Sequence, residues 1–251
     1  MNPATATLPF PPANLLTGAT LFLDFDGTLV DFAPSPDAVV VDARLGGLMQ
    51  RLAERLQGRL AIISGRSVQQ VHDLFGDISF AVAGSHGLEM RWPDGRVLAV
   101  PRPDHLTTVE AEMDRFAFEN PGVLVERKPF GAALHYRMAP QTAEACRTLA
   151  CELERRTGLQ LQAGNMVFEL KAPWADKGSA LRMFMADPEM EGTRPVFAGD
   201  DLTDEAGFAA ASALGGAGIL VGQPRSTAAS YRLENVAETL TWLETASETL
   251  R

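Results

Sequence analysis

The stretch LFLDFDGTLVDF, residues 21–32, decides the fold because a short apolar run ends abruptly in two acidic residues. Asp24 and Asp26 follow the apolar residues two positions apart. In extended chain, residues two apart project to the same side, so both carboxylates point toward one place. Gly27 then permits a tight turn. We expect this end of the strand to face a ligand, as the carboxyl ends of strands do in open parallel sheets.

The chain continues with short apolar runs that alternate with longer amphipathic segments. This alternation is typical of an α/β protein with a Rossmann-like parallel sheet. The runs are apolar on both faces, which predicts helices on both sides of the sheet. The expected strands are residues 20–25, 59–64, 80–84, 195–199 and 218–222, and the expected helices are residues 43–56, 68–76, 177–186, 203–211 and 236–250.

The rhythm changes in the middle of the chain, where residues 102–172 follow the order helix, hairpin, helix, hairpin. A segment of this length with amphipathic helices of its own is too long for a loop. We therefore expect a small α+β domain inserted into a catalytic core that is formed by residues 1–101 and 173–251.

Composition narrows the functional classes. The 251 residues are 46% hydrophobic and carry a formal net charge of −10, without a run of Lys or Arg, which argues against nucleic-acid binding. No apolar run is long enough to span a membrane, and the first residues lack a basic leader, so we expect a cytoplasmic protein. We also expect the protein to act as a monomer. Cys146 and Cys151 are predicted to be free thiols, since they lie five apart on an expected helix.

Polar residues also follow the other expected strands. Ser64-Gly65-Arg66 follows the second strand, Gly199-Asp200-Asp201 follows the strand at 195–199, and Lys177 opens the helix after the insert. Because the carboxyl ends of parallel strands meet at one edge of a sheet, we expect these side chains to lie near Asp24 and Asp26.

Carboxylates that are packed this closely raise one another's pKa unless a cation neutralises them. Oxygen donors without His or Cys suit a hard ion and predict Mg²⁺. We expect Asp200 to hold the metal beside Asp24, with Asp201 or Asp204 contributing through water. The positive charge of the metal ion would also allow an anionic phosphate to bind beside the carboxylates.

This arrangement predicts phosphoryl transfer. Asp24 would attack phosphorus as a nucleophile and form an aspartyl-phosphate. Asp26 would protonate the leaving oxygen and then deprotonate the water that hydrolyses the intermediate. The Ser64 hydroxyl and the Lys177 ammonium would bind the phosphoryl oxygens.

The motifs DFDGTL, SGR, DKG and GDDLTDE, in this order, resemble those of the haloacid dehalogenase superfamily of phosphohydrolases. The insert lies between the second and third motifs, which resembles the C2B cap arrangement of that superfamily. The resemblance implies that Asp26 supplies a backbone carbonyl to Mg²⁺.

The insert has polar residues two positions apart in three expected strands, with mostly apolar residues between them. The pairs are Glu126 and Lys128, His135 and Arg137, and Glu169 and Lys171. Such alternation gives one polar sheet face, which is either solvated or a ligand surface. We favour a ligand surface, because this mixture of charges suits a polyhydroxylated sugar.

The stretches GSHGLE, ERKPFGAALHYR and FELKAPWADKG resemble those of the trehalose-6-phosphate phosphatase family. The resemblance implies Mg²⁺-dependent hydrolysis of trehalose 6-phosphate to trehalose and inorganic phosphate. Another sugar phosphate, such as sucrose phosphate or a glycosyl phosphoglycerate, remains an alternative, as do a phosphosugar mutase and a non-catalytic sensor. The resemblance implies sugar contacts by Glu126, Lys128, Arg137 and Glu169, with Arg66 and His86 near the substrate.

Overall fold

The computed structural model describes residues 8–33, 38–76, 79–173 and 175–250. Residues 1–7 of the N-terminal stretch and Trp174 of the FELKAPWADKG motif lie outside the described residues. The chain divides into two compact units. The first contains the described residues up to Leu98 and from Asp176 onward, and the second is Ala99–Ala175.

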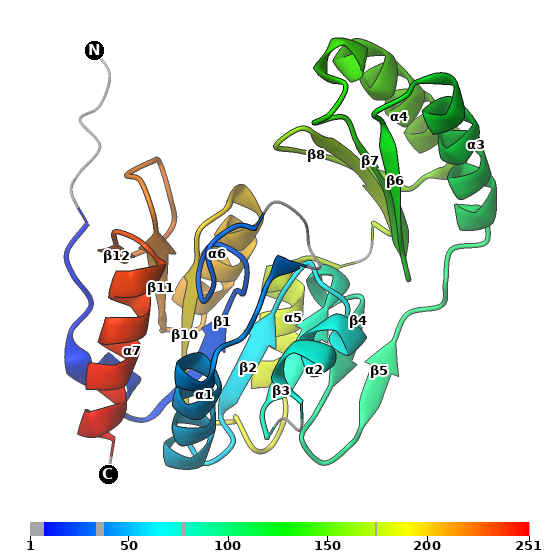
Figure 1. Ribbon diagram of the computed structural model, residues 1–251. Helices are drawn as coiled ribbons and strands as arrows, with labels where there is room; N and C mark the ends of the chain where they lie inside the picture. The colour runs from blue at the N-terminus through cyan, green and yellow to red at the C-terminus, as the bar shows by residue number, and fades with distance from the viewer. Residues whose placement is uncertain (1–7, 34–37, 77–78, 174, 251) are drawn as a thin grey trace. The chain divides into compact units, whose positions relative to one another are not determined.

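One large sheet organises the first unit, and its described strands have the order β12-β11-β10-β1-β2-β3-β4-β5 (Figure 1). The strands from β12 to β3 run parallel, and β4 is antiparallel to β3. The strand bounds are β1 Ala19–Leu23, β2 Leu60–Ile63, β3 Ala81–Gly84, β4 Glu89–Arg91, β5 Val97–Ala99, β10 Arg194–Gly199, β11 Ala217–Val221 and β12 Tyr231–Leu233.

Helices cover both faces of this sheet, as the doubly apolar strands predict. Alternate side chains of β1 face opposite sides of the sheet: Leu21 and Leu23 lie in one buried cluster, and Phe22 lies in the other. The first cluster includes residues of α1 (Ala43–Arg55), α2 (Val68–Phe75) and α7 (Val236–Thr249), and the second includes residues of α5 (Lys177–Met185) and α6 (Glu205–Ala213). The predicted α/β class is confirmed.

Side-chain caps fix where the helices near the strand ends begin. Ser67 and Gln70 form a reciprocal capping box at the start of α2, and Asp176 and Ser179 form another at the start of α5. Each box satisfies backbone N–H groups that the first helical turn leaves without partners. The Asp of the DKG motif therefore sets the first turn of α5, which is the turn that carries Lys177.

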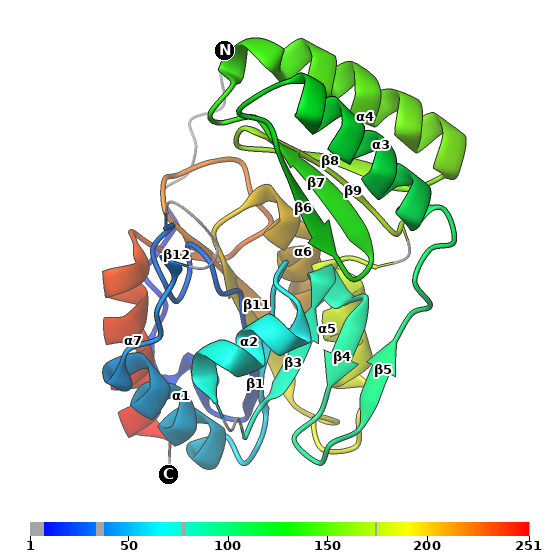
Figure 2. The ribbon, with the colours of Figure 1, turned by 45° about the vertical axis from the view of Figure 1, so that its right-hand side comes forward.

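The second unit is a four-stranded antiparallel sheet of order β6-β7-β9-β8, with α3 and α4 along one face (Figure 2). Its elements follow the expected order helix, hairpin, helix, hairpin. Apolar residues of α3, α4 and the covered sheet face form a separate core. The bounds are α3 Leu106–Glu119, β6 Leu124–Lys128, β7 Gly131–His135, α4 Ala143–Thr157, β8 Gln160–Gly164 and β9 Val167–Lys171.

After the insert, the structure differs from the expected elements in two places. The edge strand β12 was not expected, because its three residues are too few to show periodicity. The helix expected over 203–211 begins with a separate 3₁₀ turn, η5 (Leu202–Asp204), followed by α6. The other described 3₁₀ turns are η1 Ala13–Leu16, η3 Ser85–Gly87 and η4 Pro140–Thr142. Among the described residues, no helix is both long and apolar enough to cross a bilayer.

Candidate active site

Three adjacent strands of the first unit end at the residues that the sequence singled out. In the order β10, β1, β2, their carboxyl ends lead into Asp200, Asp24 and Ser64. The N–H of Asp24 donates to the Ala198 carbonyl at 2.9 Å, so β1 stays paired with β10 up to the carboxylate. The sheet order thus brings together residues that are far apart in the chain.

Lys177 lies between two buried carboxylates. Its Nζ donates to Oδ1 of Asp24 at 2.7 Å and to Oδ1 of Asp204 at 2.6 Å. All three residues are at most 4% exposed. A buried charge needs an opposite charge and hydrogen bonds close to it, and this geometry supplies both.

Asp204 also organises the loop that follows β10. Its Oδ2 accepts hydrogen bonds from the backbone N–H groups of Asp200 and Asp201, both at 2.9 Å. Both of its oxygens are therefore engaged within the protein. Asp201 is exposed, and its side chain caps η5 by accepting from the Leu202 N–H.

Negative charge exceeds positive charge in this cluster. Asp24, Asp200 and Asp204 each place a carboxylate oxygen within 4.8 Å of the others. Burial raises the pKa of Asp24 well above its usual range; Asp204 and Asp200 add to the rise, and Lys177 opposes it. Burial and the charge of Asp204 raise the pKa of Asp200 to about 6. Burial disfavours the charged form of Lys177, but Asp204 and Asp24 outweigh burial and raise its pKa.

Two glycines let the loops after β1 and β10 approach each other. Gly27 has a φ of +86°, and a Cβ there would lie 2.3 Å from Oδ2 of Asp200. At Gly199 a Cβ would lie 2.3 Å from Cγ of Asp204. Neither position has room for a side chain, so these glycines allow the acidic cluster to form.

Asp26 forms an ion pair with Arg66. Both of its carboxylate oxygens accept from the guanidinium, from Nε and from Nη2, each at 2.7 Å. The guanidinium carbon also lies 5.3 Å from the ring centre of Phe25. The Asp26 side chain is thus directed to Arg66.

The loops after β2 and β3 bring Ser64, Arg66 and His86 together. The His86 N–H donates to the Ser64 carbonyl, and the Ser85 N–H donates to the Arg66 carbonyl, both at 2.8 Å. His86 has a φ of +59°, which a residue with a side chain rarely adopts, and it is buried. Such backbone strain persists where the surrounding structure requires it and is concentrated at functional sites.

The open face of the second unit carries the polar residues that the sequence placed there. Glu126, Ala133 and Glu169 are directly opposite one another across β6, β7 and β9, and Gln162 of β8 continues the row. Nζ of Lys128 lies 2.7 Å from Oε2 of Glu169.

His135 of β7 extends this group, since its Nε2 lies 2.9 Å from Oε2 of Glu126. Nζ of Lys128 lies 4.0 Å from the same Glu126 oxygen. Arg137 follows β7 and is exposed. The alternating apolar residues Leu134, Phe168 and Leu170 lie in the core on the other face, so the expected division of the sheet into two faces is confirmed.

Sequence reasoning missed several residues that support the acidic cluster. Oγ1 of Thr28 is 3.5 Å from Oδ1 of Asp200. Arg225, in the loop between β11 and β12, donates to the carbonyl of Asp201 and pairs with Glu205. The DGT motif contained a signal for Thr28, whereas nothing in the sequence around Arg225 indicated its partners.

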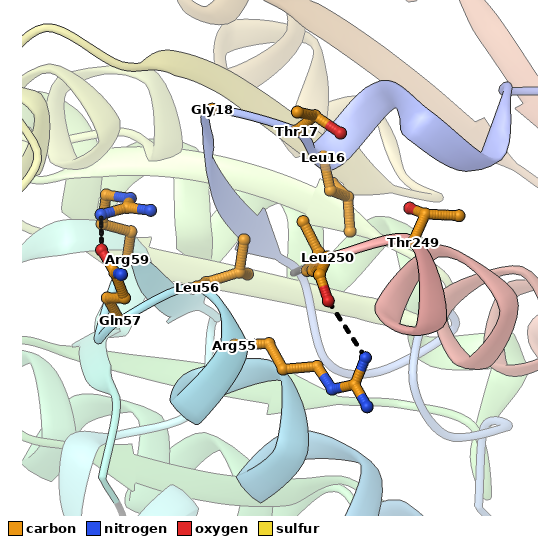
Figure 3. A pocket seen from close by; sticks show the side chains of 9 residues that line it. All are labelled: Leu16, Thr17, Gly18, Arg55, Leu56, Gln57, Arg59, Thr249 and Leu250. Atoms are coloured by element: carbon orange, nitrogen blue, oxygen red, sulfur yellow. Dashed lines mark hydrogen bonds between the residues drawn. The ribbon is translucent and has the colours of Figure 1, made fainter.

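A pocket of about 340 Å³ lies at the opposite end of the sheet (Figure 3). Gly18 and Arg59, which line it, immediately precede β1 and β2, whereas Asp24 and Ser64 follow these strands. Both arginines of the pocket have a hydrogen-bond partner: Arg55 donates to the Leu250 carbonyl, and Nη1 of Arg59 donates to Gln57. Figure 3 shows the two guanidinium groups pointing away from each other, so they do not form a common anion site.

Chains of known structure share this fold. A haloacid dehalogenase-like hydrolase from Bacteroides thetaiotaomicron shares this fold with a TM-score of 0.68 at 16% identity, covering 90% of this chain and 98% of that chain. The family model described as trehalose-phosphatase matches residues 22–237. The chain belongs to the trehalose-phosphatase family.

Individual relatives agree with this assignment. The chain is 39% identical over 232 residues to the trehalose-6-phosphate phosphatase of Escherichia coli strain K12, covering 92% of this chain and 87% of that protein. It is also 39% identical over 206 residues to a probable trehalose-phosphate phosphatase of Sinorhizobium fredii, covering 81% and 78%. The crystal structure of a trehalose-6-phosphate phosphatase related protein has a TM-score of 0.77 at 27% identity, covering 91% and 96%.

Proposed function

We propose that this chain hydrolyses trehalose 6-phosphate to trehalose and inorganic phosphate through an aspartyl-phosphate on Asp24, with Mg²⁺ as cofactor. The observation that carries the proposal is the contact of Lys177 with Asp24 in an acidic cluster at the carboxyl ends of β10 and β1. The trehalose-phosphatase relatives support the choice of substrate.

The residues of the cluster fit a divalent hard cation. All side-chain donors are carboxylate oxygens, and three carboxylates face one ammonium group. Burial and the neighbouring carboxylates raise the pKa of Asp24 and of Asp200, and a bound cation would offset both effects. Asp24, Asp200 and the backbone carbonyl of Asp26 would hold Mg²⁺, which would neutralise the carboxylates and the substrate phosphate when bound.

In the first step, Asp24 uses a carboxylate oxygen to attack phosphorus, and the bond between phosphorus and the sugar oxygen breaks. Asp26 donates a proton to that oxygen, so trehalose leaves as an alcohol. The Lys177 ammonium and the Ser64 hydroxyl stabilise the phosphoryl oxygens. Because Asp26 is paired with Arg66, we propose that its carboxyl group turns away from Arg66 when substrate binds, leaving the guanidinium for the substrate.

In the second step, Asp26 takes a proton from water, and the water oxygen attacks phosphorus of the aspartyl-phosphate. The bond between phosphorus and the Asp24 oxygen breaks. Inorganic phosphate leaves, and the Asp24 carboxylate is restored. Asp26 is protonated again and ready for the next substrate.

The insert, residues 102–172, would act as a C2B-type cap that recognises the sugar, while residues 1–101 and 173–251 would form the catalytic core. Glu126, Lys128 and Glu169 support this role because they form a charged group on the open face of the insert's sheet. Together with Arg137 they would bind sugar hydroxyls, and Arg66 and His86 would bind nearer the phosphate. That the chain acts as a cytoplasmic monomer stays a prediction from its sequence.

A panel of sugar phosphates tests the proposal. Purified protein with Mg²⁺ should release phosphate from trehalose 6-phosphate far faster than from sucrose 6-phosphate, glucose 6-phosphate or a glycosyl phosphoglycerate. EDTA should abolish the release, and added Mg²⁺ should restore it. Release from another sugar phosphate at an equal or higher kcat/KM would overturn the substrate assignment, and full activity in EDTA would overturn the role of the metal.

A further inference from the structure

The loop between β11 and β12 is tied to the loop that carries Asp200. Nη2 of Arg225 donates to the carbonyl of Asp201 at 2.8 Å and lies 3.4 Å from the carbonyl of Asp200. The contact crosses 24 positions in the chain. Arg225 thus binds two consecutive backbone carbonyls directly at the acidic cluster.

The peptide group between Asp200 and Asp201 is held from two directions. Asp204 accepts the N–H of Asp201 at 2.9 Å, whereas Arg225 approaches the carbonyl of Asp200. Opposed hydrogen bonds of this kind restrict rotation of the peptide plane. Because the Cα–Cβ bond of Asp200 follows the orientation of its own backbone, the direction of its carboxylate depends on both partners.

Glu205 fixes the guanidinium of Arg225. Its Oε1 forms an ion pair with Nη1 of Arg225. Its Oε2 accepts the N–H of Ala228 at 2.8 Å, which ties the first turn of α6 to the same loop. The Arg225 and Glu205 side chains are 23% and 27% exposed, so the pair is largely shielded from water.

We propose that Arg225 is a positioning residue for the metal site: it holds the Asp200–Asp201 backbone so that the Asp200 carboxylate is directed toward the cation. The inference rests on the proposed function, because it requires a metal at the cluster. Groups that orient metal ligands typically change metal affinity by tenfold to a hundredfold when they are removed. Arg225 acts through backbone carbonyls, so we expect about the lower limit of that range.

Calorimetric titration of Mg²⁺ into EDTA-treated, dialysed protein tests the proposal. Arg225→Ala should raise the Mg²⁺ dissociation constant about tenfold. At saturating Mg²⁺ its kcat for trehalose 6-phosphate should stay within about twofold of wild type, because Arg225 touches no reacting atom. Arg225→Lys should recover part of the Mg²⁺ affinity relative to Arg225→Ala. A lysine ammonium can reach one acceptor, but it cannot contact Glu205 and the backbone carbonyls together as the guanidinium does.

Arg44→Ala is the matched control, because Arg44 also pairs with a glutamate, Glu244, and that pair touches none of the acidic loops. It should leave the Mg²⁺ dissociation constant unchanged. Glu205→Gln is a second variant: it keeps an acceptor for the Ala228 N–H but removes the charge that anchors Arg225, and it should weaken Mg²⁺ binding in the same direction.

An unchanged Mg²⁺ dissociation constant in both Arg225→Ala and Glu205→Gln, beside a wild type that binds Mg²⁺, would overturn the inference and leave the proposed function intact. A lower kcat at saturating Mg²⁺ with unchanged affinity would also overturn it. Wild-type protein that bound no Mg²⁺ would contradict both the inference and the proposed metal.

Discussion

The Nζ of Lys177 lies 2.7 Å from Oδ1 of Asp24, although the two residues are 153 positions apart in the chain. Lys177 opens α5, directly after the insert, and Asp24 ends β1. Between these two residues the chain leaves the core unit, passes through the insert and returns to the core unit. The same ammonium holds Asp204, so one cation compensates two buried carboxylates.

Lys177→Met should keep most of the buried side-chain volume and remove the charge. Without the ammonium, the acidic cluster repels a phosphate dianion and one contact to the phosphoryl oxygens is lost. We expect kcat/KM for trehalose 6-phosphate to fall by about 10²–10³-fold. Circular dichroism should check that the variant is folded. A folded variant with more than a tenth of wild-type kcat/KM would argue against the role of Lys177.

Asp24→Asn should separate catalysis from stability. The pKa of Asp24 is raised in the folded protein, which means that its ionised form costs free energy at neutral pH. We expect the metal-free variant to melt no lower than metal-free wild type at pH 7, while hydrolysis falls by several orders of magnitude. Calorimetric melting scans in EDTA and a phosphate-release assay measure the two effects. A large loss of metal-free stability would contradict the electrostatic account.

Stabilisation by Mg²⁺ should depend on pH through Asp200. Its folded pKa of about 6 exceeds the usual value of 3.8. A carboxyl group whose pKa is raised in the folded protein stabilises the fold at pH values below its usual pKa. This contribution is lost as the pH rises through the folded pKa. Metal-free protein should therefore lose stability between about pH 4 and pH 7, and Mg²⁺ should offset the loss by pairing with the ionised group.

The measurement is the increase in melting temperature on adding Mg²⁺, taken at pH 5 and at pH 7.5. We expect a clearly larger increase at pH 7.5. Asp200→Asn should show a small increase at both pH values, because its side chain does not ionise. Equal increases at pH 5 and pH 7.5 in the wild type would show that Asp200 does not control metal binding.

Substitutions on the polar face of the insert should lower the hydrolysis of the sugar substrate and leave the hydrolysis of a substrate without a sugar unchanged. Hydrogen bonds to charged groups contribute about 1.5–3 kcal/mol each, so Glu126→Ala should lower kcat/KM for trehalose 6-phosphate about tenfold to a hundredfold. Lys128→Ala and Glu169→Ala should act in the same way. Hydrolysis of a small aryl phosphate should stay nearly unchanged in all three, since that substrate has no sugar hydroxyls.

Arg127→Ala is the matched control for this face. Arg127 is the residue between Glu126 and Lys128 in β6, but it pairs with Asp114 of α3. It should leave both activities close to wild type. If the three variants of the polar face kept wild-type kcat/KM on trehalose 6-phosphate, the face would be solvated and would not recognise the sugar.

The fold and the acidic strand ends could be predicted from sequence for a physical reason. Short apolar runs that alternate with amphipathic segments predict buried parallel strands, and parallel strands bring their carboxyl ends to one edge. Asp24 and Asp200 therefore had to lie close together once β1 and β10 were recognised. The polar face of the insert was predictable in the same way, because alternation with a period of two assigns residues to faces.

The partners within the site could not be predicted in this way. The contact of Lys177 with Asp204 depends on how α5 packs against α6, and nothing in their 27-residue separation specifies that packing. Arg225 lies in a loop without apolar periodicity, so only the three-dimensional structure reveals its contact with Asp201. Pairing of Asp26 with Arg66 likewise depends on side-chain conformation.

A rapid-quench experiment with trehalose 6-phosphate that carries radiolabelled phosphate tests the covalent route most directly. Acid-quenched wild-type protein should retain label that hydroxylamine releases, as expected of an acyl phosphate. Asp24→Asn should retain none, because it lacks the carboxylate that forms the intermediate. Rapid hydrolysis by the wild type without protein-bound label, or label retained by Asp24→Asn, would contradict the central claim that Asp24 is the nucleophile.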